Sequence, residues 1–260
     1  MILSLKEIRF DYGGGKSSSP LFDHLDLTVR EGGVTALIGR NGSGKTTLFN
    51  IISGFEPHCS GDVYYKDVRL NTLPPSRRAQ LGIGRLFQGA RLSSDLTLLD
   101  NMLLAYNPSA KMANPFASVF GRRQISQIEK KGRQDVVTLL NSFFGTGNKY
   151  VEKLDEPAEA LSFGEQRLIA LVRLMLGNYD LLLLDEPTSG VNPVHVTRIE
   201  EIIHRMQDEG KTILLIEHNI GFVRQTADSC AYLEDGRIVK EDDTATVLSD
   251  EHIKNSYLGV

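Results

Sequence analysis

The segment that most constrains the fold is an apolar run that leads directly into a glycine-rich loop. Residues 34–38 are expected to form a strand buried on both faces, and a helix is expected from about residue 45 to residue 53. Glycines in such a loop let backbone N–H groups turn inward around phosphate oxygens, and the helix N-terminus adds partial positive charge. The predicted phosphate-binding residues are Gly39, Arg40, Asn41, Gly42, Ser43, Gly44, Lys45, Thr46 and Thr47.

A second apolar run ends in two carboxylates. Residues 181–184 are all leucine and precede Asp185 and Glu186. A buried parallel strand fixes its last residues at the carboxyl edge of the sheet, where ligands bind in such folds. We therefore expect Asp185 to bind Mg²⁺ together with the Thr46 hydroxyl, and Glu186 to act as the base that polarises an attacking water. Taken alone, Asp185-Glu186 would also suit a capped turn.

The order of expected strands and helices predicts an α/β protein with a mostly parallel core sheet. The first third is β-rich, with alternating patterns that bound a Gly/Ser-rich loop at residues 13–20. The middle, residues 90–161, is expected to be helical, and the last third returns to alternating helices and strands. The predicted strands are 2–10, 21–29, 34–38, a pair within 61–70, 181–184 and 212–216, and the predicted helices are 45–53, 100–105, 127–140, 165–176 and 193–207.

Composition excludes several classes of protein. The 260 residues are 41% hydrophobic and 24% charged, an ordinary globular balance. The net charge of −4 disfavours binding to a nucleic-acid backbone. The two cysteines, Cys59 and Cys230, form no metal-ligand spacing and no disulfide framework, which fits a reducing compartment. We expect no transmembrane span, because every apolar run is far shorter than about 20 residues. We expect no signal peptide, because the chain starts with an alternating strand-like run and not with a positively charged segment followed by an apolar one.

A third motif indicates a resemblance to a known protein family. Residues 161–166, Leu-Ser-Phe-Gly-Glu-Gln, resemble the signature of ABC-type ATPases, whose common form has another glycine at the position of Phe163. Ser162 and Gly164 would begin a helix that presents a hydroxyl and N–H groups to phosphate, while Ser162 and Glu165 would also form a capping box. The resemblance covers essentially the whole chain. It implies a P-loop NTPase fold with a RecA-like core sheet, an N-terminal antiparallel β subdomain and a helical subdomain.

The resemblance implies roles for further residues. Gln88 looks like the glutamine that reaches the metal and the attacking water, and His218 like the histidine that contacts the γ-phosphate. Tyr12 looks like the aromatic that stacks on adenine, although Phe10 and Phe22 remain alternatives. The implied cofactors are ATP and Mg²⁺. The partner-facing nucleotide contacts would be Ser162, Phe163, Gly164, Glu165 and Gln166.

The resemblance also implies an assembly. The chain would be one ATPase domain, with residues 1–88 and 162–260 as the nucleotide-binding core and residues 89–161 as the helical subdomain. Two subunits, identical or different, would pack head to tail with ATP between the phosphate loop of one and residues 162–166 of the other. Permease subunits would contact residues 89–102, including Arg91 and Leu92, unless this segment is an ordinary linker. The protein would then lie peripherally on the cytoplasmic face of the inner membrane.

One departure from the family points to a branch. Where many members have Ser-Ala-Leu-Asp, residues 189–193 are Ser-Gly-Val-Asn-Pro, and Asn192 lacks the negative charge of that aspartate. This resembles ATPase subunits of branched-chain amino-acid importers, and of urea or short-amide importers, which work with an extracytoplasmic binding protein. ATPases that extract lipopolysaccharide share the pattern. Other shared segments are residues 85–88, 98–101, 216–219 and 256–259.

The long insertion at residues 108–132 favours the larger importer subunit. The basic residues of segment 111–133 form a solvated face, or else contact an anionic membrane or an acidic partner. A nucleic-acid-associated ABC ATPase is disfavoured because the chain has one cassette, no sustained heptads and no paired cysteines. A small GTPase would lack residues 161–166.

Overall fold

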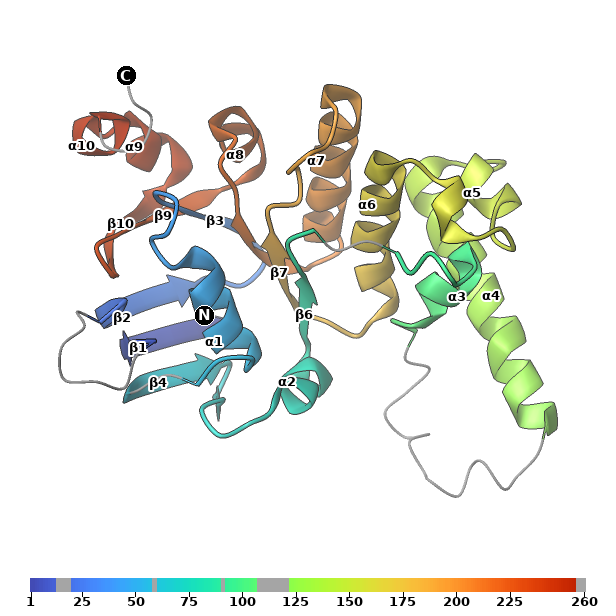
Figure 1. The fold of residues 1–260 in the computed structure, drawn as a ribbon, viewed down its shortest axis with the longest axis horizontal. Coiled ribbons are helices and arrows are strands. Elements are labelled where there is room, and N and C mark those ends of the chain that lie inside the picture. The colour runs from blue at the N-terminus through green and yellow to red at the C-terminus, as the bar shows by residue number, and fades with distance from the viewer. Residues whose placement is uncertain (13–19, 58–59, 90–91, 107–121, 256–260) are drawn as a thin grey trace. The chain divides into compact units, whose positions relative to one another are not determined.

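The computed structural model describes residues 1–12, 20–57, 60–89, 92–106 and 122–255, with side chains of the last range from residue 129 onward. It divides into two compact units (Figure 1). The first unit comprises Met1–Gln88, Tyr179–Ser189 and Ile203–Val260, and the second comprises Gly89–Asn178 and Gly190–Ile202. Residues 89–161, the expected helical subdomain, lie in the second unit, together with residues 162–178 and 190–202.

An antiparallel sheet forms the N-terminal part of the first unit, with strand order β2-β1-β4-β5. Its strands are β1 (Leu3–Phe10), β2 (Phe22–Val29), β4 (Ser60–Tyr65) and β5 (Val68–Arg69). β1 and β2 each begin one residue after the start of the strands expected at 2–10 and 21–29. β4 and β5 are the pair expected within 61–70, with β4 beginning one residue earlier. The β1–β2 register shifts between Leu5 and Ile8. A second shift lies between Ile8 and Phe10. Glu7 at the first irregularity and His24 at the second both have positive φ, and irregularities of this kind increase the local twist of a sheet.

The second sheet of this unit has the order β10-β9-β3-β8-β7-β6. All its strands are parallel except β10, which pairs antiparallel with β9. β3, β7 and β8 are completely buried, as their apolar sequences require. Their carboxyl ends therefore share one edge of the sheet. The strands are β3 (Val34–Ile38), β6 (Ile83–Leu86), β7 (Leu181–Asp185), β8 (Thr212–Ile216), β9 (Ser229–Glu234) and β10 (Arg237–Asp243).

Helix α1 (Lys45–Ser53) joins the two sheets of the first unit into one hydrophobic core, to which it contributes Leu48, Phe49, Ile51 and Ile52. Its carboxyl end is capped by a buried arginine, because Arg78 Nη1 donates to the carbonyl oxygens of Ile51 and Ile52 at 2.6 and 2.9 Å. Burial lowers the pKa of Arg78 to about 10. The other helices of this unit are α2 (Pro75–Leu81), α8 (Ile220–Thr226), α9 (Thr244–Ser249) and α10 (Glu251–Ile253).

The second unit is helical. Its long helix, α4, begins at Arg122, five residues before the expected start at 127. The expected helix at 165–176 is α6 followed by a 3₁₀ turn, Arg173–Leu176. The elements are α3 (Leu98–Leu103), α4 (Arg122–Phe144), α5 (Lys149–Glu152), a 3₁₀ turn (Ala158–Ala160), α6 (Phe163–Val172) and the beginning of α7 (Pro193–Asp208).

Some sequence predictions fall outside the described residues. These are the loop at 13–19, Cys59, Arg91, most of the basic insertion including Lys111, and residues 256–259. In the part of the chain that the structure describes, we find no helix with the length and apolar character needed to span a membrane. Cys230 is buried in β9, and burial raises the pKa of its thiol to about 12, so that it stays protonated and inert.

Candidate functional site

The phosphate loop connects β3 to α1 as the sequence predicts. Two of its glycines have no room for a side chain: a Cβ on Gly39 would lie 2.3 Å from the Leu233 carbonyl oxygen, and one on Gly44 would lie 2.7 Å from the Phe22 ring. Gly44 also has φ of 100°, a conformation that glycine adopts at no steric cost. The loop backbone is therefore fixed between β9 and the antiparallel sheet.

The charges and donors of this loop fit a polyphosphate. The Lys45 ammonium is buried and donates to the carbonyl oxygens of Gly39 and Arg40 at 2.6 and 2.9 Å. Burial lowers the pKa of Lys45, while the nearby charges of Glu186 and Asp185 act in the opposite direction. Among the described residues, the buried Ser43 hydroxyl has no hydrogen-bond partner. The first turn of α1 contains no acidic residue, which favours an anion at this helix N-terminus.

Two predicted catalytic residues, Gln88 and His218, both contact the carboxylate of the third, Glu186. Gln88 Nε2 donates to Glu186 Oε2 at 2.9 Å, and His218 Nε2 lies 3.2 Å from Glu186 Oε1. They come from the ends of β6, β7 and β8, which are neighbours in the sheet. Glu186 has φ of 47°, a sparsely populated conformation for a residue with a side chain and one that clusters at functional sites.

Asp185, the last residue of β7, is fully buried beneath this cluster. Its Oδ2 lies 3.3 Å from Arg85 Nη2, and the Arg85 side chain is only 5% exposed. The other Arg85 terminal nitrogen donates to Asn50 Oδ1 and Ser53 Oγ of α1 at 2.8 and 2.7 Å. Burial lowers the pKa of Arg85, and the Asp185 charge counteracts this. Arg85 thus links the expected metal carboxylate to α1.

Sequence reasoning assigned no role to Arg85 or to Glu217. Glu217 Oε1 accepts from Thr188 N at 2.8 Å and from Thr188 Oγ1 at 2.7 Å, and its Oε2 accepts from His218 N at 3.1 Å. Glu217 therefore fixes the turn after Glu186 and the backbone of His218. Its signal in the sequence is a charged residue that directly follows a buried strand, and the signal for Arg85 is an arginine inside a short apolar run.

Tyr12 lies beside the phosphate loop. Its hydroxyl is 2.5 Å from Thr47 Oγ1, and its ring, on a residue that is 70% exposed, packs edge-on against Phe10 with centroids 4.9 Å apart. Phe10 and Phe22, the alternatives, are buried at 4% and 0% exposure. Tyr12 also lines a cavity of about 770 Å³, together with Pro20, Leu21, residues 40–43 and residues 234–236.

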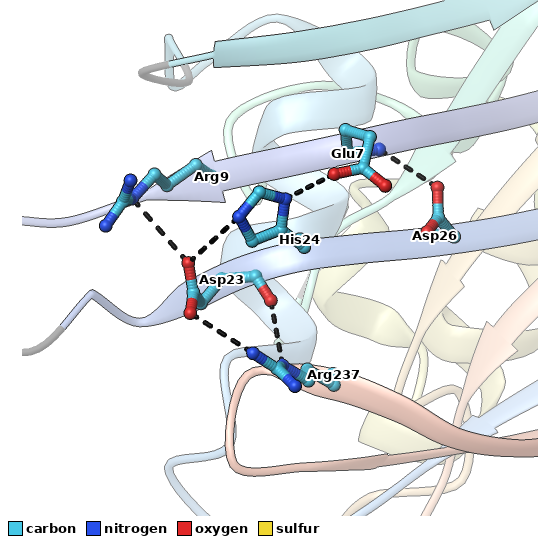
Figure 2. A network of polar contacts seen from close by, with 6 residues as sticks. All are labelled: Glu7, Arg9, Asp23, His24, Asp26 and Arg237. Atoms are coloured by element: carbon cyan, nitrogen blue, oxygen red, sulfur yellow. Dashed lines mark hydrogen bonds and ion pairs between the residues drawn. The ribbon is translucent and has the colours of Figure 1, made fainter.

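A network of polar contacts braces one wall of this cavity. Arg237 donates to the Asp23 carbonyl oxygen at 3.0 Å and to Asp23 Oδ2 at 3.2 Å. These bonds tie the start of β2 to the β9–β10 turn, where Gly236 packs so closely that a Cβ would lie 2.5 Å from the Leu21 carbonyl oxygen. Figure 2 shows the full network of Glu7, Arg9, Asp23, His24, Asp26 and Arg237.

The predicted signature segment caps α6 in the second unit. Ser162 Oγ accepts from Glu165 N at 3.4 Å and Glu165 Oε2 accepts from Ser162 N at 2.7 Å, so the capping box is present. Burial would raise the pKa of Glu165, but the Lys149 ammonium and the Ser162 donors hold it at about 2. Gln166 donates back to the carbonyl oxygens of Ala158 and Leu161. The segment is a rigid, capped helix N-terminus with Ser162 exposed.

The structure describes no group of three or more His, Cys, Asp or Glu residues that suits a metal ion. The predicted Mg²⁺ ligands, Thr46, Gln88 and Asp185, offer one hydroxyl, one amide and one carboxylate. This sparse oxygen set fits Mg²⁺, which typically keeps waters and phosphate oxygens as its remaining ligands. The donor chemistry is therefore compatible with Mg²⁺ bound together with a nucleotide.

The profile of the ABC transporter family matches residues 22–189. The lipopolysaccharide export system ATP-binding protein LptB of Escherichia coli K12 is 31% identical, over 99% of this chain and 97% of its own length. The high-affinity branched-chain amino acid transport ATP-binding protein LivG of the same strain is 27% identical, over 99% and 98%. A nucleotide-free ATP-binding cassette from an ABC transporter superposes with a TM-score of 0.80 at 28% identity, covering 100% and 99% of the two chains.

These similarities extend over the whole chain and confirm both the fold class and the family resemblance that the sequence predicts. The solved ADP conformation of MJ1267, an ATP-binding cassette of an ABC transporter, is 28% identical with a TM-score of 0.79 and covers 100% of this chain and 99% of its own. The chain therefore belongs to the ABC transporter family, of which it is an ATP-binding subunit that hydrolyses ATP.

Proposed function

We propose that the chain drives an ABC transporter by closing on ATP with a second ATPase subunit and reopening after hydrolysis. The observation that carries this proposal is the Glu186 carboxylate, held between Gln88 and His218 at 2.9 and 3.2 Å. The carboxylate is also near enough to the buried Lys45 to influence its pKa. A general base, a water-orienting amide and a phosphate-contacting imidazole are thus assembled beside a phosphate loop.

Each residue of this cluster has a distinct role in the proposal. Residues 39–47 bind the phosphates, with Lys45 at the outer ones and Ser43 supplying a hydroxyl. Thr46, Gln88 and Asp185 would hold Mg²⁺, which when bound neutralises negative charge on the phosphates. Glu186 accepts a proton from the attacking water. His218 contacts the γ-phosphate and reports its loss to β8.

Tyr12 is the proposed adenine platform. The exposure of its ring and its position on the 770 Å³ cavity support this role, whereas the burial of Phe10 and Phe22 disfavours them. A base stacked on an aromatic ring contributes about 1–3 kcal/mol. The Asp23–Arg237 contacts would keep the opposite wall of the cavity in place.

The second ATPase subunit, identical or related, would contribute the other face of each nucleotide site. The capped N-terminus of α6 supports this, because a helix N-terminus favours anions and the capping box holds this one in place. The proposed nucleotide contacts there are Ser162, Phe163, Gly164, Glu165 and Gln166. The Ser162 hydroxyl, together with backbone N–H groups of the first turn of α6, would contact the γ-phosphate of the ATP held by the partner. Closure on ATP is then a direct consequence of having phosphate donors on both subunits.

Permease subunits are the proposed membrane partners, with the chain peripheral on the cytoplasmic side. Phe55 and Phe87 are 54% and 42% exposed, pack edge to face and line a cavity of about 280 Å³ with Pro75 and Tyr179. Exposed aromatic rings of this kind suit an apolar docking surface, and Phe87 directly precedes Gln88. Of the expected contact residues in 89–102, Leu92 and Met102 are buried, which disfavours their direct contact with a partner.

For the transported substrate we propose import of branched-chain amino acids or related small amides, with an extracytoplasmic binding protein. Asn192-Pro193 and the insertion at 108–132 support this branch, as does the similarity to LivG. Lipopolysaccharide or lipid extraction by a homodimer is the second candidate, because LptB has the higher identity, 31% against 27%.

The test uses tagged Glu186→Gln protein, expressed in its native cell and solubilised in mild detergent with ATP and Mg²⁺. Mass spectrometry identifies the proteins that co-purify. Multi-spanning permeases with a second, related ATPase are the expected result, and the accompanying binding protein would indicate the substrate. A single ATPase species with lipid-exporting membrane subunits would transfer the assignment to the second candidate. Ribosomal or DNA-bound partners without any membrane protein would refute the transporter role.

A further inference from the structure

Two helix N-termini of the helical unit are joined by reciprocal contacts between an aromatic ring and a glycine. His195, in the first turn of α7, packs on Gly164 of α6, where a Cβ would lie 2.2 Å from His195 Cδ2. Phe163, in the first turn of α6, packs on Gly190 in the loop before α7, where a Cβ would lie 3.3 Å from Phe163 Cε1. The ring from α7 therefore packs on a glycine of α6, and the ring from α6 packs on a glycine of the loop before α7. We call these four residues the ring–glycine clasp.

The clasp depends on both glycines. A Cβ closer than about 3 Å to a ring cannot exist without movement of the backbone or the ring, so Gly164 admits His195 only because it lacks a side chain. Gly190 has φ of 72°, which adds a conformational reason for glycine there. Phe163 and His195 are both partly buried. These contacts are therefore close packing between partly buried groups.

Both sides of the clasp are also anchored by hydrogen bonds. On the α7 side, Asn192 Oδ1 accepts from His195 N at 3.1 Å, so the loop residue Asn192 is tied to the residue that covers Gly164. On the α6 side, the Glu165 carboxylate is bonded to Ser162 N and to the Lys149 ammonium. Packing and capping together leave the Ser162 end of α6 and the residue 190–192 loop little freedom to move separately.

We propose that Phe163 and His195 are positioning residues that make the Ser162 segment and the residue 190–192 loop one rigid element for engaging the second ATPase subunit. This inference rests on the proposed function, in which Ser162 contacts the ATP of the partner. Phosphate donors must be held to within about 0.5 Å to be effective. A helix N-terminus clamped to the adjacent loop meets that requirement, whereas one fixed only by its own cap would fray.

The test measures ATP-driven dimerisation of His195→Ala in the Glu186→Gln background by light scattering. The matched control is Thr197→Ala, an exposed position of the same helix. Binding of a fluorescent ATP analogue by the monomer is measured in parallel. We expect His195→Ala to bind the analogue within twofold of the parent, but to raise the dimer dissociation constant at least tenfold. Thr197→Ala should leave both within twofold. Equal dimerisation of the two variants would overturn the inference.

A ring-restoring variant guards against simple misfolding. His195→Phe again covers Gly164 with a ring, so it is expected to dimerise within about threefold of the parent even if His195→Ala proves unstable. A loss as large as that of the alanine variant, in a protein that still binds the analogue, would contradict positioning by ring packing.

Ser162→Arg, in the same background, separates failure of this inference from failure of the proposed function. If Ser162→Arg dimerises normally, the head-to-tail site itself is wrong. If Ser162→Arg blocks dimerisation while His195→Ala does not, only the clasp is refuted.

Discussion

The carboxylate of Glu217 bonds twice to Thr188, 2.8 Å from the backbone nitrogen and 2.7 Å from the hydroxyl. The pair joins the end of β8 to the turn that follows Glu186, and Glu217 is only 3% exposed. The two loops that carry the proposed base and the proposed phosphate-contacting histidine are therefore held together by a buried residue.

Glu217→Gln is expected to lower kcat about tenfold to hundredfold and to leave ATP affinity nearly unchanged. The amide retains one acceptor oxygen but loses the charge that strengthens hydrogen bonds to Thr188 and His218, so Glu186 and His218 lose alignment while the phosphate loop is untouched. Steady-state kinetics and equilibrium nucleotide binding measure the two quantities. An unchanged kcat would show that the hydrogen bonds of Glu217 to Thr188 and His218 are unimportant for turnover.

Arg85→Met is expected to destabilise the first unit by about 3–5 kcal/mol, because removing one partner of a buried pair leaves the other charge uncompensated. Asp185→Asn in the same chain should recover part of that loss. Thermal or urea unfolding is measured for the parent, both single variants and the double variant. The four free energies of unfolding give the coupling free energy between Arg85 and Asp185. Strictly additive losses would mean that Arg85 and Asp185 do not interact in the folded protein.

The pH dependence of stability should reveal the capping box of α6. The folded-state pKa of Glu165 is about 2, below the ordinary value of 4.5, so its contribution is complete above pH 4.5 and is lost as the pH falls toward 2. The shift corresponds to at most about 3 kcal/mol at neutral pH. Urea unfolding between pH 6 and pH 3 should show a steeper acid loss for the parent than for Glu165→Gln. Parallel curves would contradict the assigned pKa.

Continuous apolar runs made much of the core predictable. The bounds of β3, α1 and β8 are those expected, and β7 is one residue longer, because a glycine or a charged residue interrupts the sequence pattern at the end of each. β10 was not predicted, since it is largely charged and exposed, as an edge strand can be. β6 and α2 were missed because each is shorter than the window over which periodicity can be detected.

Sequence reasoning named the residues of the candidate site, but it did not predict the contacts between them. Gln88, Glu186 and His218 each follow a strand, yet their meeting depends on β6, β7 and β8 being neighbours, with Asp185 opposite Ile216. That register is decided by packing between segments that are distant in the chain, about 100 residues for β6 and β7 and about 30 residues for β7 and β8. The roles of Arg85 and Glu217, and the clasp of α6 with α7, follow from the same tertiary packing.

The most direct test of the central claim compares purified Glu186→Gln with the parent for ATP hydrolysis, ATP binding and ATP-driven dimerisation. The account predicts that the variant binds ATP as the parent does, loses nearly all turnover and accumulates as an ATP-bound dimer. Hydrolysis at the parental rate would contradict the assignment of Glu186 as the base on which the proposed mechanism depends.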